Sequence, residues 1–448
     1  MLITNANIIT WGKPNEILAD AALLVLDGKI ADFGPSADLA ARYPDAALFD
    51  ARGQLLLPGS ICAHTHFYGM YSRGLAIPGE PAARFAQILD NLWWPLDQAL
   101  DEEAVRLSAL VCMVDAIKHG TTTLIDHHAS PNFLSGSLNA IAEEVEKAGL
   151  RASLCYETTD RYGEAKMREA IDENVSFIKT VKDGSRPLLR GTFGLHAPLT
   201  ISTPTLEACL KAIDGLEVGI HIHVSESNDD RETLKARGDG LPIVWLARHG
   251  ALNDKSIIAH AVHVDQEEIE LLAKSGAWVT HQPRSNMNNA VGVAQTENML
   301  ESGVKVCLGN DGFSNSMWEE WRAAYLLHKI AHKDPRRMGG YSVTAMAIDN
   351  NAAFASAMYG MPIGMIAKGA AADLMLVDYQ SPTPLTAGNL PWHILFGFRE
   401  SMVTGTIVNG QWLMRERQLL TLDESEIAAR ARELAPRVWE KYNQFAAA

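Results

Sequence analysis

The sequence predicts an α/β fold in which eight parallel strands alternate with helices, either closed into a (β/α)8 barrel or open as a doubly wound sheet. The first observation is that short apolar, β-rich runs from Leu55 onward are separated by longer segments with helical periodicity. This alternation is typical of βα units in a parallel sheet. The expected strands lie near residues 56–63, 121–126, 151–156, 189–195, 218–224, 256–260, 278–281 and 305–309.

The second observation is that three intervening segments have the signals of capped helices. DEEAVRLSALVCMVDAIKHG begins with Asp101 as a cap and has acidic residues in its first turn. TPTLEACLKAI, from Thr203 or Thr205, and DQEEIELLAKSG, from Asp265, repeat the arrangement. These segments therefore predict helices between the strands.

Both ends of the chain differ from this central region. Residues 1–57 alternate short apolar runs with turn signals, and Asp27-Gly28 between apolar flanks predicts a hairpin. After about residue 366, strand-like alternation returns in AKGAAADLMLVDY and SMVTGTIVNGQWLMRERQ. The simplest interpretation is one small β-sandwich made of residues 1–57 plus 366–448, beside a central unit of residues 58–365.

Composition and charge argue against several classes of partner. The chain has 448 residues, 47% of them hydrophobic, and a formal net charge of -15 without a cluster of Lys and Arg, so we expect no nucleic-acid or membrane partner. Its five cysteines are far apart and form no Cys-x-x-Cys pair, which predicts buried free thiols. We see no leader sequence and no apolar run of about 20 residues, so we expect a cytoplasmic protein.

Histidines gather where the expected strands end. In the stretch HTH, His64 and His66 are two residues apart and point to the same side of a strand, which suits a metal ion. A barrel places its catalytic residues at the C-terminal ends of its strands, so the residues at the ends of the other expected strands are the further candidates. These ends carry His196 in LHAP, His221, His223 and Glu226 in HIHVSE, His260 and His263 in AHAVH, His281 in HQPRSN and Asp311 in LGNDG.

In this order, the motifs resemble the amidohydrolase superfamily, in particular its cytosine-deaminase-like branch of hydrolytic deaminases and triazine hydrolases. The resemblance covers essentially the whole chain, from PG-x-x-x-x-HTH to LGNDG. LWWPLDQAL at 92–100, DHHASP at 126–131 and YETTDRYG at 156–163 look like the SsnA-type aminohydrolases. The resemblance implies a (β/α)8 barrel with a flanking β-sandwich from both termini and one divalent metal ion, usually zinc or iron.

By residue matching, the resemblance implies His64, His66, His223 and Asp311 as metal ligands, with Glu226 and His260 acting beside them. Such a cation can lower the pKa of bound water from 15.7 to about 7. Glu226 would carry a proton from this water to a ring nitrogen of the substrate, and His260 would hydrogen-bond the developing oxyanion. Asp311 would take the second proton as ammonia leaves.

The sequence therefore predicts a deaminase that hydrolyses an exocyclic amine from a small N-heterocycle. We expect the substrate to contact His196, His281, Arg161 and Tyr68, and we expect His221 and His263 to be packing residues. Trp93-Trp94 is expected to pack a helix against the barrel or to cover a planar ring. In members of the superfamily that hold two metal ions, a carboxylated lysine at the end of the fourth strand bridges them. The expected strand at 189–195 has no lysine, so the resemblance implies a single metal ion.

Two other functions stay open at this point. A dechlorinating or N-alkylamine-releasing hydrolase would use the same hydroxide, and the ligand set does not distinguish ammonia from chloride as the leaving group. A metal-free scaffold would have gaps in the ligand set, and the sequence has none. A homo-oligomer is an expectation from family habit alone, and the choice between zinc and iron stays open because histidine and carboxylate bind both.

Overall fold

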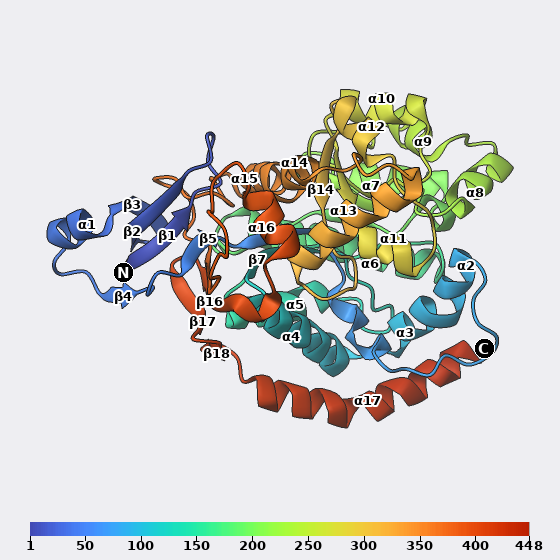
Figure 1. The fold of residues 1–448 in the computed structure, drawn as a ribbon. Helices are drawn as coiled ribbons and strands as arrows, with labels where there is room; N and C mark the ends of the chain where they lie inside the picture. Colours follow the sequence, from blue (N-terminus) through green and yellow to red (C-terminus); the bar gives the residue numbers. More distant parts are fainter. Residues whose placement is uncertain (448) are drawn as a thin grey trace.

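The computed structural model describes residues 1–447 and contains two parallel sheets that hold the central strands (Figure 1). The four-stranded sheet has the order β6-β7-β8-β9 and the five-stranded sheet the order β10-β11-β12-β13-β14. The strands are β6 (Ser60–Thr65), β7 (Thr121–Asp126), β8 (Arg151–Leu154), β9 (Leu189–Gly191), β10 (Phe193–Leu195), β11 (Ile220–Val224), β12 (Ile257–His260), β13 (Trp278–His281) and β14 (Lys305–Leu308).

The two parallel sheets meet at both of their edges. β9 and β10 are separated by Thr192 alone, so the predicted strand 189–195 is one extended segment that changes sheets. At the other edge, Thr65 in β6 forms a parallel bridge with Asp311. Gly309 approaches His64 so closely that a Cβ atom at position 309 would lie 2.8 Å from the His64 backbone. The C-terminal ends of β6 and β14 are therefore held against each other.

Helices cover the strands, and two of the three predicted caps are confirmed, whereas α7 is capped by Ser202, just before the expected Thr203 or Thr205. Asp101 accepts a hydrogen bond from the Ala104 amide at the start of α4, and Asp265 with Glu268 forms a capping box at the start of α10. In the central region the helices are α2 (Phe85–Ile88), α3 (Trp94–Ala99), α4 (Glu102–Lys118), α5 (Ser137–Ala148), α6 (Gly163–Lys182), α7 (Thr203–Ala212), α8 (Asp229–Arg237), α9 (Pro242–Arg248), α10 (Gln266–Ser275), α11 (Pro283–Asn288), α12 (Thr296–Glu301), α13 (Met317–His332), α14 (Gly340–Thr344) and α15 (Asn351–Tyr359). Shorter turns are η1 (Phe67–Ser72), η2 (Leu89–Trp93), η3 (Pro198–Thr200) and η4 (Ala345–Asn350).

An apolar cluster fills one end of the space between the parallel strands. Phe354 of α15 packs there with side chains from five strands, namely Ala63, Ile125, Ile257, Trp278 and Cys307. The amide of Asn351, also in α15, donates to the carbonyl groups of Ile61 and Leu308. Because this end is filled by α15, the histidines at the opposite strand ends are left to build a site.

Strands from both chain ends form one mixed sheet, which contains antiparallel and parallel pairs. The sequence predicted that the two ends would come together. The order of this sheet is β18-β17-β16-β15-β5-β1-β2-β3, with β4 beside β1. The strands are β1 (Leu2–Ile9), β2 (Ile17–Leu26), β3 (Lys29–Pro35), β4 (Leu48–Asp50), β5 (Leu55–Pro58), β15 (Leu374–Val377), β16 (Val403–Val408), β17 (Gln411–Arg415) and β18 (Gln418–Leu419). The Asp27-Gly28 turn joins β2 to β3, which confirms the predicted hairpin.

The predicted strand at 56–63 is two strands in the structure. β5 belongs to the terminal sheet, where it pairs with β1 and β15, and β6 belongs to the central region. Between them the backbone passes so close to Thr122 that a Cβ atom at Gly59 would lie 2.2 Å from that side chain. Glycine therefore permits the chain to cross from one sheet to the other at this point.

The last part of the chain leaves the terminal sheet as a long helix. The other helices outside the central region are α1 (Ser36–Arg42), α16 (Leu390–Phe396) and the turn η5 (Glu400–Met402). The last helix, α17 (Glu424–Ala446), begins with Asp423 as its cap. It runs along α4 and α3, where its C-terminal end lies near η2 (Figure 1). None of the helices within residues 1–447 combines the length and the apolar character that a membrane crossing requires.

Candidate metal centre and substrate cavity

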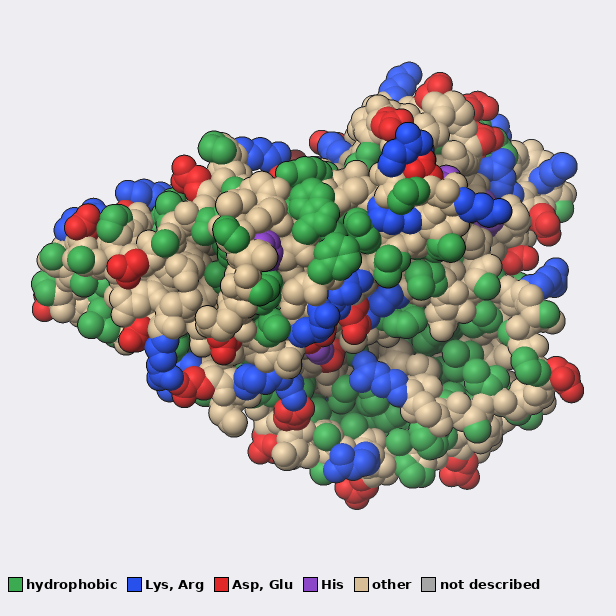
Figure 2. All heavy atoms as spheres, in the orientation of Figure 1, with side chains coloured by type: hydrophobic (Ala, Val, Ile, Leu, Met, Phe, Trp, Pro, Cys, Tyr) green, Lys and Arg blue, Asp and Glu red, His purple; other side chains and the backbone are tan. Residues whose placement is uncertain are grey.

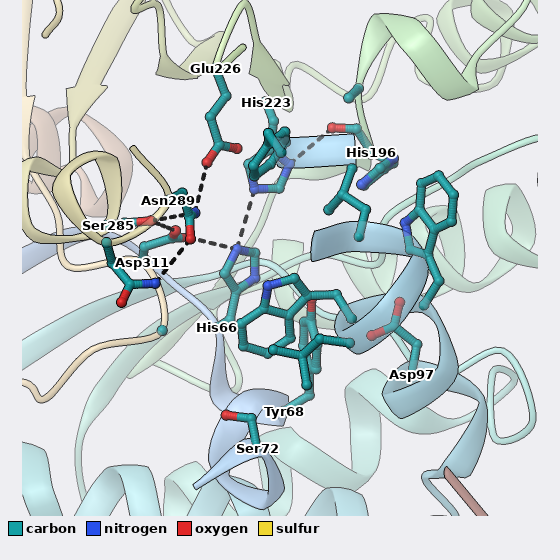
Figure 3. Close-up of a pocket in the computed structure, with 18 of the residues that line it drawn as sticks. His66, Tyr68, Ser72, Asp97, His196, His223, Glu226, Ser285, Asn289 and Asp311 are labelled. Carbon is teal, nitrogen blue, oxygen red and sulfur yellow. Dashed lines mark hydrogen bonds and ion pairs between the residues drawn. The ribbon is translucent and has the colours of Figure 1, made fainter. Parts of the chain in front are cut away.

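The four residues predicted as metal ligands converge at the C-terminal ends of the parallel strands. His66 Nε2 lies 2.9 Å from Asp311 Oδ1, and His64 Nε2 lies 3.2 Å from the same oxygen. His223 Nε2 lies 3.2 Å from His66 Nε2. Figure 3 shows His66, His223 and Asp311 pointing toward one another from different elements.

The donor atoms of this cluster fit a divalent cation. Within residues 1–447, His64 Nε2, His260 Nε2 and Asp311 Oδ1 are buried and make no hydrogen bond of normal geometry. A buried polar atom without a partner costs about 1–3 kcal/mol. The donor atoms of His64, His260 and Asp311 lie within 4.8 Å of one another, so one bound cation would satisfy all three. Imidazole nitrogens and a carboxylate oxygen are donors that zinc and iron both accept.

The charges of the cluster also favour a bound cation. Burial lowers the pKa of His64 to about 4 and holds the pKa of His223 well below its usual value, so both rings are neutral, which is the form that binds metals. Burial also opposes a charge on His66, yet its contact with Asp311 raises the His66 pKa to about 9. The Asp311 carboxylate therefore attracts a positive charge to this point.

Backbone carbonyl groups orient two of the imidazoles. His66 Nδ1 donates to the His127 carbonyl over 2.6 Å, and His223 Nδ1 donates to the His196 carbonyl over 2.9 Å. With Nδ1 occupied as a donor, the neutral form of each ring presents the lone pair of Nε2 to the centre of the cluster, and a bound cation would take the place of the proton that Asp311 favours on His66. Such outer contacts set ring orientation and basicity in metal sites.

His64 is oriented by another histidine that the sequence assigned to packing. His221 Nε2 lies 2.8 Å from His64 Nδ1, and both rings are fully buried. The HIHV pattern contains the signal for this contact, because His221 and His223 are two residues apart and face the same side of β11. His221 is therefore a positioning residue behind the cluster, whereas His263 Nε2 donates to the Val291 carbonyl, consistent with packing.

Several residues of the site adopt left-handed backbone conformations. The φ angles of Ser225, His260 and Asp311 are 52°, 73° and 59°. Such conformations cost a non-glycine residue about 1–3 kcal/mol and gather at functional sites. Asp311 is held in place by its carbonyl, which accepts from Thr65 Oγ1 over 2.8 Å, and by Ser285 Oγ, which donates to its Oδ2 over 2.5 Å.

Glu226 lies beside the cluster between two partners. Its Oε1 accepts from Asn289 Nδ2 over 3.2 Å, and its Oε2 lies 3.4 Å from His260 Nε2. Burial raises the pKa of the Glu226 carboxyl to about 7, and His260 opposes this shift. The His260 ring is held by Asn286 Oδ1, 2.9 Å from Nδ1. Neither asparagine was predicted as a site residue from the sequence. Asn286 lies in α11, and Asn289 directly follows its last residue.

A cavity of about 440 Å³ opens beside the cluster. His66, His223, Glu226 and Asp311 lie on its wall, as Figure 3 shows. The apolar residues on the wall are Tyr68, Phe85, Leu89, Leu92, Trp93, Trp94, Leu199 and Phe313. Trp93 and Trp94, for which the sequence allowed either packing or a place over the substrate, therefore both face the cavity. They lie where the π-helical turn η2 meets α3, and such turns are frequent at functional sites.

The structure divides the predicted substrate contacts into two groups. Tyr68 and His196 line the cavity. Arg161 and His281 lie behind the wall, outside the lining residues found within 1–447. Arg161 pairs with Glu157 and lies over the Trp94 ring, 4.7 Å from its centroid.

The position of His281 follows from the two faces of β13. Trp278 packs inside with the apolar cluster of five strands, whereas Val279 packs on the outer face against the covering helices. His281 is two residues beyond Val279 and therefore also faces outward. Its Nε2 lies 3.3 Å from Nε2 of His328 in α13.

Comparisons with known proteins match almost the whole chain. The family model described as "Amidohydrolase family" matches residues 55–413, and a model for the bacterial imidazolonepropionase-like composite domain matches residues 21–46. The chain is 30% identical over 442 residues to a 5-methylthioadenosine/S-adenosylhomocysteine deaminase of Pelotomaculum thermopropionicum, covering 98% of each chain. It is 29% identical over 447 residues to a 5'-deoxyadenosine deaminase of Methanosarcina mazei, covering 99% of each.

Solved structures share the fold. An adenosine deaminase from Xanthomonas campestris with bound zinc superposes with a TM-score of 0.86 at 24% identity, over 98% of each chain. The atrazine chlorohydrolase of Arthrobacter aurescens with zinc superposes with a TM-score of 0.80 at 22% identity, over 97% of this chain and 100% of the other.

Proposed function

The chain belongs to the amidohydrolase family, and on that premise we propose that it is a metal-dependent deaminase that hydrolyses an exocyclic amine from a small N-heterocycle. The observation that carries the proposal is the convergence of His64, His66, His223 and Asp311 beside Glu226 at the wall of a cavity. The adenosine-type deaminases among the relatives support ammonia as the leaving group.

We propose zinc as the metal ion, held by His64, His66, His223 and Asp311. The zinc in the adenosine deaminase from Xanthomonas campestris supports this choice over iron. A bound zinc ion would make hydroxide available at neutral pH. Because the strand segment 189–195 has no lysine to bridge a second ion, one ion per chain is sufficient for the proposal.

Glu226 is assigned the proton transfer. It would accept a proton from the attacking water and donate it to a ring nitrogen of the substrate, while oxygen bonds to the carbon that carries the amine. Asn289 keeps the Glu226 carboxyl directed to the cavity by its hydrogen bond to Oε1. His260 would donate a hydrogen bond to the added oxygen, and Asp311 would pass the second proton to the amine as the C–N bond breaks and ammonia leaves.

Substrate contacts are assigned by position on the cavity wall. We assign direct contacts to Tyr68 and His196, which both face the cavity. Arg161 would act through its neighbours, because it pairs with Glu157 and packs on the indole of Trp94. His281 would act only through the outer packing of β13.

For the architecture, we infer one closed (β/α)8 barrel of residues 58–365. The Thr65–Asp311 bridge and the continuity of β9 with β10 support closure. We also infer that the terminal sheet, residues 1–57 plus 366–448, folds on itself as a β-sandwich. One apolar cluster contains Leu23 of β2 and Ile407 of β16, although β15, β5 and β1 lie between these two strands in the order of that sheet.

A second candidate is release of chloride or an alkylamine from a triazine. The observation that favours it is the fold shared with the zinc-containing atrazine chlorohydrolase. The proposed chemistry is the same up to the departure of the leaving group. Only product analysis separates the two functions.

The test begins with the metal. Purified protein is analysed for zinc and iron, stripped with a chelator and reconstituted with each ion. Ammonia, chloride and alkylamine release are then measured on adenosine and its 5'-substituted derivatives, guanine and atrazine. We expect one equivalent of zinc and zinc-dependent ammonia release. Failure to bind a stoichiometric transition metal would favour the scaffold, and chloride or alkylamine as the product would favour the second candidate.

A further inference from the structure

The cavity wall presents large apolar side chains that are not fully packed. Phe85, Leu92, Trp93, Trp94 and Phe313 are each only half-buried, although they lie inside a cavity. Figure 2 shows hydrophobic side chains around a hollow on this face of the molecule, in the region where Figure 1 places α2 and α3. Apolar surface left open in a cavity is stabilised by an apolar ligand group that displaces water from it.

The apolar wall begins at the metal centre. The Tyr68 ring lies 5.3 Å from the His66 ring and 6.3 Å from the Trp93 ring, measured between centroids. The Trp93 indole also reaches within 4.0 Å of a Cβ atom placed on Gly312, the residue after Asp311. A substituent on a heterocycle bound at the centre would therefore extend along the Trp93 face.

A second aromatic path leads from the other side of the centre. The His196 ring lies 5.9 Å from the ring of His223, and the Trp94 indole lies 6.3 Å from the His196 ring. Trp94 is backed by the Arg161 guanidinium, which fixes the indole plane. The two tryptophans thus offer apolar surface on both paths away from the metal.

The inner wall carries three buried carboxyl groups. Asp97, Glu157 and Asp230 line the cavity and are buried, and burial raises the pKa of each carboxyl. Asp97 Oδ1 has no hydrogen-bond partner within residues 1–447. The guanidinium of Arg161 lies behind the wall and is engaged by Glu157.

Among the described residues that line the cavity, Arg73 is the one lysine or arginine. It is exposed, and its charge helps to lower the pKa of Asp115, which also lines the cavity. An anionic substituent on the inner wall would therefore lose its hydration beside carboxyl groups, without a cation to compensate it.

We propose that this cavity selects heterocycles with an uncharged, apolar substituent and discriminates against the same heterocycle with a carboxylate-bearing substituent. The inference rests on the proposed function, because it places the reacting ring at the metal centre. The name of the Pelotomaculum relative joins two compounds that differ in this respect. 5-Methylthioadenosine has a methylthio group, whereas S-adenosylhomocysteine has a zwitterionic amino-acid group on the same nucleoside, whose ammonium and carboxylate would both lose hydration against the apolar wall. This chain should prefer the first.

The test measures binding without turnover. Zinc-loaded Glu226→Gln protein is titrated calorimetrically with 5-methylthioadenosine, S-adenosylhomocysteine and adenosine. We expect the methylthio compound to bind at least about tenfold more tightly than S-adenosylhomocysteine, and more tightly than adenosine. Equal or tighter binding of S-adenosylhomocysteine overturns the inference, and so does the absence of binding by the methylthio compound.

Two variants in the same background assign the preference to the wall. Trp93→Ala should weaken binding of 5-methylthioadenosine more than binding of adenosine, and Leu92→Arg should narrow the difference between the methylthio and carboxylate compounds. Trp392→Ala, on the distant helix α16, is the matched control and should leave all three dissociation constants unchanged. If Trp93→Ala weakens the binding of all three compounds equally, the wall does not discriminate between their substituents, and the inference is overturned. The proposed function fails separately, if zinc-loaded wild-type protein binds these compounds but releases no ammonia.

Discussion

Replacing Glu226 with glutamine tests the assigned proton transfer with the smallest change in shape. The glutamine oxygen can still accept from Asn289 Nδ2, now 3.2 Å from Oε1, and its amide group still faces His260 Nε2. The side chain remains beside the cluster, so fold and metal content should be unchanged. A carboxamide neither accepts nor donates a proton at neutral pH, so the proton transfer and with it the chemical step should be slowed.

The expected loss is large. A positioned general acid or base contributes about 10²–10⁴-fold to a rate, which corresponds to about 2.7–5.4 kcal/mol in the activation free energy. Ammonia release by the zinc-loaded variant should therefore fall by at least about a hundredfold in kcat. Single-turnover measurements with excess enzyme separate this loss from slow product release. Metal content is measured on the same preparation.

Glu173→Gln is the matched control for this substitution. Glu173 is also a buried glutamate, but it accepts hydrogen bonds from the backbone amides of Gly136 and Leu138, outside the cavity lining. Its replacement should leave kcat unchanged at temperatures where the protein is folded. Near wild-type turnover in zinc-loaded Glu226→Gln would refute the proton-transfer assignment.

Three further substitutions test other parts of the structure. His223→Ala removes one Nε2 donor and should lower bound zinc below one equivalent, as measured by elemental analysis after desalting. Asp373→Ala leaves Arg151 buried without the carboxylate that it contacts over 2.5 Å, and should cost about 3–5 kcal/mol, or roughly 3–5 °C in the calorimetric Tm of a chain of this length. Tyr442→Phe removes the hydrogen bond from α17 to the carbonyl of Asn91 in η2, and should raise KM more than it changes kcat, because η2 carries Trp93 to the cavity wall.

Each of these has its own control. His249→Ala changes a half-buried histidine outside the cavity lining, 3.6 Å from Glu207, and should retain zinc. Replacing Arg151 by methionine in the Asp373→Ala background should recover part of the lost stability, because no unpaired buried charge remains. Tyr379→Phe removes a comparable hydroxyl bond, to His393, away from the cavity and should leave KM unchanged. Full zinc in His223→Ala, an unchanged Tm in Asp373→Ala, or an unchanged KM in Tyr442→Phe would each contradict the reasoning.

Local patterns were sufficient to locate the parallel strands and three of the helices between them. Hairpin and cap signals act over a few residues, and the structure confirms Asp27-Gly28 as a turn and Asp101 and Asp265 as helix caps. The spacing of two residues in an expected strand also implied a shared face for His64 and His66, and the Nε2 atoms of both rings lie within 3.2 Å of Asp311 Oδ1. The strand-end motifs thus gave the candidates, and the resemblance to the amidohydrolase superfamily implied which four of them bind the metal ion.

Only the tertiary structure decided which of these side chains meet. His223 and His281 both occupy strand ends, but β11 directs the first to the metal centre, whereas β13 directs the second to α13. The direction depends on which face of each strand the helices cover, and that is a property of the packed sheet. Left-handed turns at His260 and Asp311 then aim these side chains. The turn-prone sequence Asn310-Asp311-Gly312 favours the turn at Asp311, whereas no short-range pattern encodes the turn at His260.

The cavity depends on the same long-range packing. Trp93 and Trp94 gave the same local signal for packing as for substrate contact, and the placement of α17 and η2 brings them to the wall. The chain alone thus determined its elements and its chemically active residue types, because helix caps, turns and strand periodicity act between near neighbours. Their convergence within about 3 Å arises from the tertiary packing that holds the ends of β6 and β14 together, which brings residues as distant as His66 and Asp311 into contact.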